Sequence, residues 1–358
     1  MNTEALLAVL DQFLNTPVVV RCSVEKAAPD AFWRKLHAIA DRAEPRLREA
    51  ILRAIAKTVE GVDMTALEQA FARGHLDDAM AAIPWTDVGE PALRAAYVTI
   101  LTDTYDQAGQ ATATDLGGRL DMGVSFSLDN PRATAWAESV AATRVTDVSD
   151  ETVSAIRSIL SRGFEEGIHP YDMARMIRGP KDPETGQYTS SVIGLTERQA
   201  HAVYNYRDTL QNDDIERSTE QEDRMVERYR DQLVLLRAET IARNETMKAS
   251  SEGQRELWHQ AKVDGYLRGT ERRIWIDTGD ERECVECAEM ADTYGDDTQA
   301  IGLDEPYVTP DGEEIMVPSD IHIQCRCVDG LVQADVQDTA DAQPDDEQPD
   351  DEQPEEGA

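Results

Sequence analysis

Four cysteines and one histidine near the C-terminus have the spacing of a metal site. Cys284 and Cys287 form a C-x2-C pair, and the sequence H-x2-C-x-C contributes His322, Cys325 and Cys327. Thiolate and imidazole are the donors that zinc prefers, usually four of them in a tetrahedron. We therefore predict one structural zinc ion here, because four protein ligands leave no position open for a reacting water.

Five donors compete for four positions. If the last residues form a strand, Cys325 and Cys327 face the same side of it. The ligands would then be Cys284, Cys287 and Cys325 with either His322 or Cys327, and we favour His322 although the spacing does not decide. Two structural disulfides, or reduced buried thiols, are the competing interpretations. We expect no secretory leader and thus a reducing compartment, where clustered cysteines bind metal more often than they pair.

Known catalytic motifs are missing elsewhere in the sequence. Cys22 stands alone and is expected to be a buried thiol, since no partner that could activate it is nearby. The six histidines are scattered, and no H-E-x-x-H, G-x-S-x-G, P-loop or G-x-G-x-x-G occurs. We therefore predict a protein that is not an enzyme and has no catalytic residues.

Charge argues against general binding to nucleic acid. The 358 residues carry a formal net charge of −36, and a DNA duplex is itself a polyanion. No run of about 18 uncharged apolar residues occurs, so no membrane span is expected. Local basic density is highest from Arg224 to Arg273, but acidic residues interleave, as in the pair Glu239 and Arg243. An ion-paired face is the favoured interpretation, and Arg268, Arg272 and Arg273 are the best candidates for a nucleic-acid contact.

The fold class expected is mainly α. Apolar residues recur at three- and four-residue steps, as at Leu47, Ile51, Ile55 and Val59. We predict a helical N-terminal domain over residues 1–125 and a helical core over 126–269. A small β-rich module held together by metal would cover 270–334, and a disordered acidic tail 335–358.

Helix ends have local signals. Ser149, followed by Asp150 and Glu151, resembles an N-cap. Pro170 suits the first turn of a short helix, and Thr196 with Gln199 predicts a capping box. A long helix is expected over 221–249.

The C-terminal module and tail differ from the rest in composition. A Pro-Asp-Gly turn at 310–312, between Val308 and Ile315, predicts a β-hairpin, and 322–332 is expected to end the module as a strand. Residues 335–358 hold eleven acidic and no basic residues. This tail is expected either to stay solvated or to mimic the charge of DNA on a basic partner surface.

Residues from about 150 to 332 resemble the phage head morphogenesis family of the Mu protein F type. The resemblance lies in the order of segments: VSDETVSAIRSIL, GIHPYDMARMIRG, IGLTERQAHAVYNYRDTL, RAETIARNETMKASSEGQRELW, C-x2-C and the terminal H-x2-C-R-C. The RAETIAR…ET run and H-x2-C-R-C are the most specific parts. The family often has Pro-Asn between the His and the Cys, where this chain has Ile323-Gln324.

The resemblance implies a minor head protein, a capsid component of the virion that acts in procapsid assembly and in DNA packaging or ejection. It implies the portal protein as partner, with the major capsid or scaffolding protein and packaged DNA as further contacts. The expected location is the capsid interior near the portal, and the host cytoplasm during assembly. Two other functions remain open: a zinc-stabilised nuclease of the His-Asn-His type, and a zinc-ribbon adaptor that binds a host protein.

Overall fold

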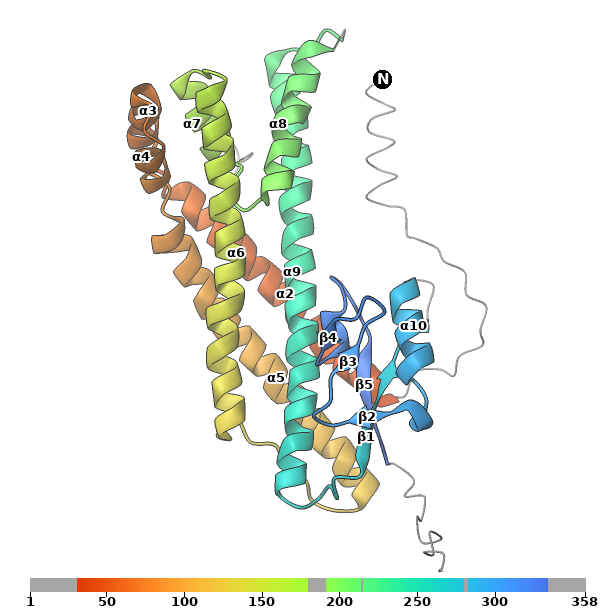
Figure 1. Cartoon of the computed structure of the whole chain (residues 1–358). Coiled ribbons are helices and arrows are strands. Elements are labelled where there is room, and N and C mark those ends of the chain that lie inside the picture. Colours follow the sequence, from red (N-terminus) through yellow and green to blue (C-terminus); the bar gives the residue numbers. More distant parts are fainter. Residues whose placement is uncertain (1–30, 180–190, 214, 280–282, 334–358) are drawn as a thin grey trace, which may run out of the picture.

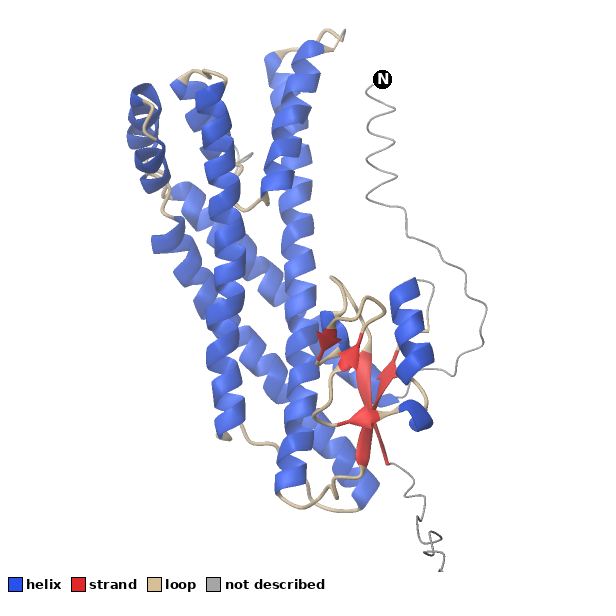
Figure 2. Ribbon diagram, viewed as in Figure 1, coloured by secondary structure: helices blue, strands red, loops and turns tan. Residues whose placement is uncertain are grey.

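The computed structural model describes residues 31–179, 191–213, 215–279 and 283–333. Long helices form an elongated bundle, and a small module with short strands lies against its side (Figures 1 and 2). The predicted mainly-α fold is therefore confirmed. Cys22, the loop expected at 180–190 and the acidic tail 335–358 lie outside the described residues. No helix in the described part of the chain is apolar over a stretch long enough to cross a membrane.

Within the described residues, four long helices build the bundle. The predicted apolar stripe from Leu47 to Val59 is buried on the first of them, where it faces the core. The last and longest helix packs against the first two along much of its length. The four are α2 (Ala31–Glu60), α5 (Glu90–Leu120), α6 (Pro131–Glu165) and α9 (Thr219–Val263).

Short helices close one end of the bundle. The capping box predicted at Thr196 and Gln199 is present, and Pro170 occupies the first helical position as expected. A second capping box, Ser218 with Gln221, begins the longest helix two residues before the predicted start. The short helices are α3 (Met64–Arg73), α4 (Leu76–Ala81), a π-helical turn (Trp85–Gly89), α7 (Pro170–Arg178) and α8 (Glu197–Asn212).

The N-cap predicted at Ser149 is wrong. Asn130 caps the helix instead, and α6 runs without interruption through Ser149. The buried Ser149 hydroxyl accepts a bond of 2.8 Å from the Trp85 indole and donates one of 3.0 Å to Glu90. Tertiary partners therefore satisfy a side chain whose local sequence is typical of a helix start.

One hydrophobic core crosses the boundary predicted at 125/126. Its buried residues run from Ala43 of α2 through Tyr97 of α5 to Ile156 of α6 and Ala249 of α9. The two predicted helical domains therefore share a single core, because helices far apart in sequence bury their stripes against each other.

The C-terminal module has a three-stranded antiparallel sheet and a separate hairpin. In the sheet, the central strand β1 pairs with β2 on one side and β5 on the other. The predicted hairpin is confirmed, with Tyr307 opposite Ile315. The elements are β1 (Glu271–Ile276), α10 (Val285–Tyr294), β2 (Ile301–Gly302), β3 (Tyr307–Val308), β4 (Glu314–Ile315), a 3-10 turn (Pro318–Asp320) and β5 (Val328–Gln333).

The final strand begins later than predicted. β5 starts at Val328, so His322, Cys325 and Cys327 lie on the loop before it. Gln324 has a φ of 66°, in the left-handed region, which reverses the chain within this loop. The expectation that Cys325 and Cys327 share one face of a strand is therefore wrong.

Gly253 sets the distance between α5 and α9. A Cβ at this position would lie 2.2 Å from the Tyr105 carbonyl oxygen, and a backbone atom cannot move aside as a side chain can. We expect Gly253→Ala to lower the free energy of unfolding by about 1–3 kcal/mol, as overpacking of a core does. Urea denaturation of the full chain measures this.

Gly118 is the matched control because it lies in α5 with no heavy atom within 4 Å of a Cβ built on it. Gly118→Ala should raise the free energy of unfolding by about 0.5–1 kcal/mol, since alanine loses less backbone entropy in a helix. Equal shifts in the two variants would contradict the close approach at Gly253.

Candidate metal centre

The fold brings all five predicted donors together. Cys284 is the N-cap of α10 and Cys287 lies in its first turn, while His322, Cys325 and Cys327 come from the loop before β5. Two groups of possible ligand atoms result, each with its atoms within 4.8 Å of one another. Cys287 belongs to both, with Cys284 and His322 in one and with Cys325 and Cys327 in the other.

Short contacts between side-chain donor atoms link four of the five. His322 Nε2 lies 3.1 Å from the Sγ atoms of both Cys284 and Cys287. Cys287 Sγ lies 3.7 Å from Cys325 Sγ. The four cysteines that the structure describes are free thiols, so the disulfide interpretation finds no support there. Soft donors at these separations can hold a metal ion.

Local backbone geometry explains the convergence. The Cys284 thiol caps α10 by accepting a bond of 3.3 Å from the Cys287 N–H, which folds C-x2-C into one turn. In the second segment, the Cys325 N–H bonds to the His322 carbonyl at 3.3 Å across the left-handed Gln324. His322 Nδ1 lies 2.9 Å from the Ile323 carbonyl oxygen. That bond directs the other ring nitrogen, Nε2, toward the thiols, as second-shell partners of metal-binding histidines do.

Hydrogen bonds and burial within the cluster shift the pKa values of its donors. The hydrogen bond with Cys287 raises the pKa of His322 to about 8, and burial raises the pKa of Cys284 to about 11. Hydrogen bonds from Cys287 and Cys327 hold the pKa of Cys325 well below its usual range. Hydrogen bonds of Cys327 with Cys287 and Cys325 raise the pKa of Cys327. A bound cation would replace these shared protons.

The cluster lies at the centre of the module's own small core. Cys287, Cys325 and Cys327 are buried together with Trp275 and Tyr307. Sulfur atoms thus fill positions that larger apolar side chains occupy in a bigger domain. A module of this size has little apolar surface to bury, which is the usual setting for a structural metal.

The loop that carries the donors is fastened to the helical bundle on two sides. His37 Nε2 of α2 lies 2.8 Å from the Arg326 carbonyl oxygen, and the Gln324 amide donates to Thr240 Oγ1 of α9 at 3.0 Å. Further along α9, Lys248 pairs with Asp320 at 2.7 Å, and Gln254 donates to the Asp329 carbonyl at 2.9 Å. The geometry of the cluster and the docking of the module are therefore coupled.

Sequence patterns gave no indication of the role of His37. It lies 285 positions before His322, and only the fold brings it to the loop of residues 322–327, which we call the donor loop. Burial lowers its pKa, and its ring stacks on Trp33 with centroids 4.0 Å apart. The neutral ring with a proton on Nε2 donates to the Arg326 carbonyl, so this nitrogen serves docking rather than metal binding.

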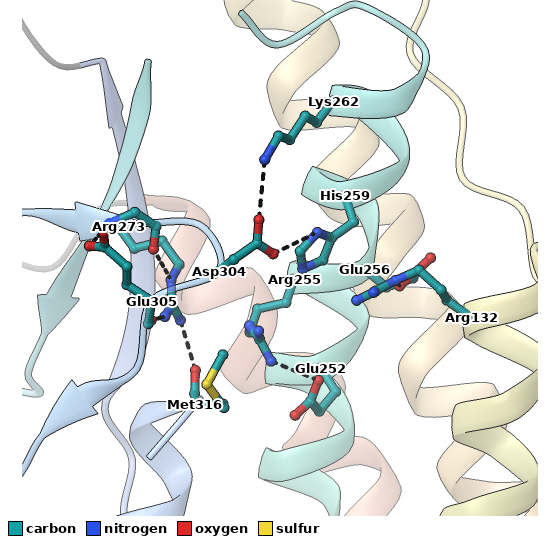
Figure 3. A network of polar contacts seen from close by, with 11 residues as sticks. Arg132, Glu252, Arg255, Glu256, His259, Lys262, Arg273, Asp304, Glu305 and Met316 are labelled. Atoms are coloured by element: carbon teal, nitrogen blue, oxygen red, sulfur yellow. Dashed lines mark hydrogen bonds and ion pairs between the residues drawn. The ribbon is translucent and has the colours of Figure 1, made fainter. Parts of the chain in front are cut away.

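The prediction that Arg273 contacts nucleic acid at the surface is wrong. Its side chain is 0% exposed and its guanidinium donates to Asp329 Oδ1 at 3.2 Å and to the Met316 carbonyl at 2.7 Å. The Glu305 carbonyl accepts a further bond, visible with that to Met316 in Figure 3. Tyr307 donates to the same Asp329 oxygen at 2.7 Å. Arginine is the cation best suited to such a site because its planar group serves several acceptors at once.

Arg268 and Arg272, the other two candidates, do not form a basic surface with Arg273. Arg268 is exposed, whereas Arg272 is half-buried and donates to main-chain carbonyls of residues 269–271. Along α9, Arg237 pairs with Glu151 of α6 at 2.8 Å, and Glu239 pairs with Arg48 of α2 at 2.9 Å. Charges on this helix thus form ion pairs between helices, rather than only along one exposed face.

More ion pairs lie where α9 meets the module, as Figure 3 shows. His259 and Lys262 of α9 both reach Asp304, at 3.4 and 3.2 Å. One turn earlier, Arg255 pairs with Glu252 at 3.3 Å, and burial raises the pKa of Glu252. The charged groups of this junction thus have partners, and they lie beside a buried apolar cluster that contains Trp258 and Leu303.

A serine–histidine contact on α6 and α8 was not singled out from the sequence. Ser158 Oγ lies 2.8 Å from His201 Nε2 and 2.9 Å from Glu197 Oε1. In a catalytic triad the carboxylate bonds to the far nitrogen of the histidine. Here the far nitrogen, Nδ1, lies 3.3 Å from the Arg162 guanidinium, and Glu197 accepts from the serine. The arrangement does not activate the hydroxyl as a nucleophile.

Comparisons of this chain with family models, with curated proteins and with solved structures each find no match.

Removal of the Arg273 guanidinium should destabilise the module strongly. We expect Arg273→Met to lower the free energy of unfolding by about 3–5 kcal/mol, because it leaves the buried Asp329 carboxylate without its counter-charge. The double variant Arg273→Met, Asp329→Asn should recover part of this loss. Chemical denaturation measures both effects.

Arg268→Met serves as control, since the exposed Arg268 side chain should contribute no more than about 0.5 kcal/mol. If Arg273→Met had an equally small effect, the buried pair would not be a principal stabilising contact of the module.

Metal affinity should rise with pH. Below about pH 8 the ion-free protein carries a proton on His322, and a metal ion must displace it, so binding weakens as pH falls and strengthens as pH rises. Each displaced proton changes the affinity about tenfold per pH unit. Competition with a chromophoric chelator from pH 6 to 9 measures the slope, and an affinity independent of pH would refute proton displacement.

Proposed function

We propose that this chain is a phage minor head protein: a structural, non-enzymatic component of the virion that associates with the portal and acts in head assembly and DNA packaging or ejection. In this proposal one zinc ion holds the C-terminal module in the conformation that docks on the helical bundle. The proposal rests on the resemblance of residues 150–332 to the phage head morphogenesis family and on one observation about where its motifs lie.

The observation is that the two most specific motifs of the resemblance touch each other. The RAETIARNETMKASSEGQRELW run lies on α9, and the H-x2-C-R-C run is the donor loop. Thr240 of the first bonds to Gln324 of the second, while Lys248 and Gln254 bond to Asp320 and the Asp329 carbonyl nearby. Two motifs separated in sequence thus form one interface, which gives them a shared structural role.

The turn within H-x2-C agrees with the resemblance. The left-handed residue is Gln324, at the position where the family often has Asn, a residue that adopts this conformation more readily. The same left-handed turn therefore suits both the Asn of the family and Gln324 of this chain.

We assign the zinc ligands to Cys284, Cys287, His322 and Cys325. Contacts of 3.1 to 3.7 Å between side-chain donor atoms link these four. When bound, the ion supplies cross-linking of α10 to the donor loop. Four protein ligands complete a tetrahedron, and the residues themselves fix the loop and orient His322.

Binding to a portal ring and metal content test the proposal together. We expect the purified full chain to hold one zinc per molecule by elemental analysis and to co-elute with the portal protein of the same phage in size-exclusion chromatography. Cys284→Ser and His322→Ala should lose the zinc, and the matched control Cys22→Ser should keep it.

Absence of portal association by zinc-loaded protein would overturn the virion assignment, and absence of stoichiometric metal would overturn the zinc site. Cleavage of plasmid DNA with a divalent ion, abolished by His322→Ala, would instead establish the nuclease. Stable capture of a host protein without the portal would establish the adaptor.

A further inference from the structure

We propose that a hydroperoxide oxidises Cys287 and Cys327 at the metal centre to a disulfide. Oxidation of this centre thereby weakens the attachment of the module to the helical bundle. The inference rests on the proposed zinc site for its consequence, release of the ion. It concerns Cys327, the donor that the ligand assignment leaves unused.

Cys327 is a spare thiol held beside the ligands. Its side chain is 1% exposed, and its sulfur lies within 4.8 Å of the sulfur atoms of Cys287 and Cys325. A tetrahedral ion takes four donors, and the cluster offers five. The fold therefore keeps one thiol in reach of two ligand thiolates without a position for it on the ion.

Cys287 is the thiol best placed to be oxidised and then to pair with a neighbouring thiol. It alone belongs to both groups of possible ligand atoms among the described residues. A cavity of about 320 Å³ adjoins the centre, and its lining includes Cys284, Cys287 and Cys327. Cys325 is not among the described residues that line it. A small hydroperoxide in this cavity meets Cys284, Cys287 and Cys327, and of these only Cys327 is left without a place on the ion by the ligand assignment.

The reaction is a two-electron oxidation in two steps. The Cys287 thiolate attacks the peroxide, so that an S–O bond forms, the O–O bond breaks and the alkoxide or hydroxide takes a proton from solvent. The Cys327 thiolate, after losing its proton to solvent, attacks this sulfenic sulfur; the S–S bond forms, the S–O bond breaks, and water leaves. Two thiols are oxidised, and the hydroperoxide is reduced to an alcohol (or water) and a further water.

The consequence reaches the helical bundle. A disulfide at Cys287 removes one ligand thiolate, and the ion is held by fewer donors. The donor loop also carries two of the contacts that fasten the module, from Gln324 to Thr240 and from the Arg326 carbonyl to His37. Movement of Cys327 toward Cys287 displaces Arg326, its chain neighbour, and loosens this fastening.

The experiment treats zinc-loaded Cys22→Ser protein with hydrogen peroxide, blocks the remaining thiols, and maps disulfides by mass spectrometry of peptides. Released zinc is followed with a chromophoric chelator. We expect a peptide pair joined between Cys287 and Cys327, about one zinc released per disulfide, and recovery of both thiols and zinc binding after dithiothreitol. Hydrogen exchange at α2 and α9 around His37 and Thr240 should rise with oxidation.

Cys327→Ser is the matched variant. Cys327→Ser should keep its zinc before treatment but pass irreversibly to sulfinic acid at Cys287, because the resolving thiol is gone. A disulfide between Cys284 and Cys287, or an unchanged reversible disulfide in Cys327→Ser, would overturn the pairing. If the untreated protein holds no zinc, the proposed zinc site fails, while the mapped disulfide still decides the inference about the two thiols.

Discussion

The convergence of five soft donors inside a module with a very small core is the constraint on which the rest of the C-terminal structure depends. Cys284 and Cys287 come from the start of α10, and the other donors come from a loop more than thirty residues later. Cys287, Cys325 and Cys327 are buried in one cluster with Trp275 and Tyr307 at the centre of the module. Apolar burial alone stabilises a unit of this size weakly. The conformation of the loop, the hairpin and the sheet edge therefore follows from how these donors meet.

A second, polar constraint places the module on the bundle. Buried charge is tolerated only where partners surround it, and Arg273 meets this condition with Asp329 and main-chain carbonyls. The contacts to α9 and α2 combine hydrogen bonds and ion pairs with apolar packing: Val328 shares a buried cluster with Leu36 and Met247, and Leu303 shares one with Trp258. Such an interface gives register and orientation, because each donor must find its acceptor. Loop geometry at the donors and docking on the helices are consequently parts of one arrangement.

Prediction from sequence succeeded where neighbouring residues decide the outcome. The helical stripe of α2, the capping box at Thr196, the first-turn Pro170 and the hairpin at 310–312 all depend on periodicity or on backbone preferences of a few residues. It failed at Ser149 and at the strand expected over 322–332. In both places a contact from a distant segment, or a left-handed turn at a residue that rarely forms one, outweighed the local pattern.

The sequence by itself determined the chemistry available: soft donors at C-x2-C and H-x2-C-x-C spacing, an acidic chain, and helices with defined ends. Tertiary structure alone decided which groups meet. It brought Cys287 between two sets of donors, buried Arg273 against Asp329, and carried His37 of α2 to the donor loop. The physical reason is the range of the interactions. Helix propensity and capping act over a few residues, whereas distances among side chains from different elements depend on how the whole core packs.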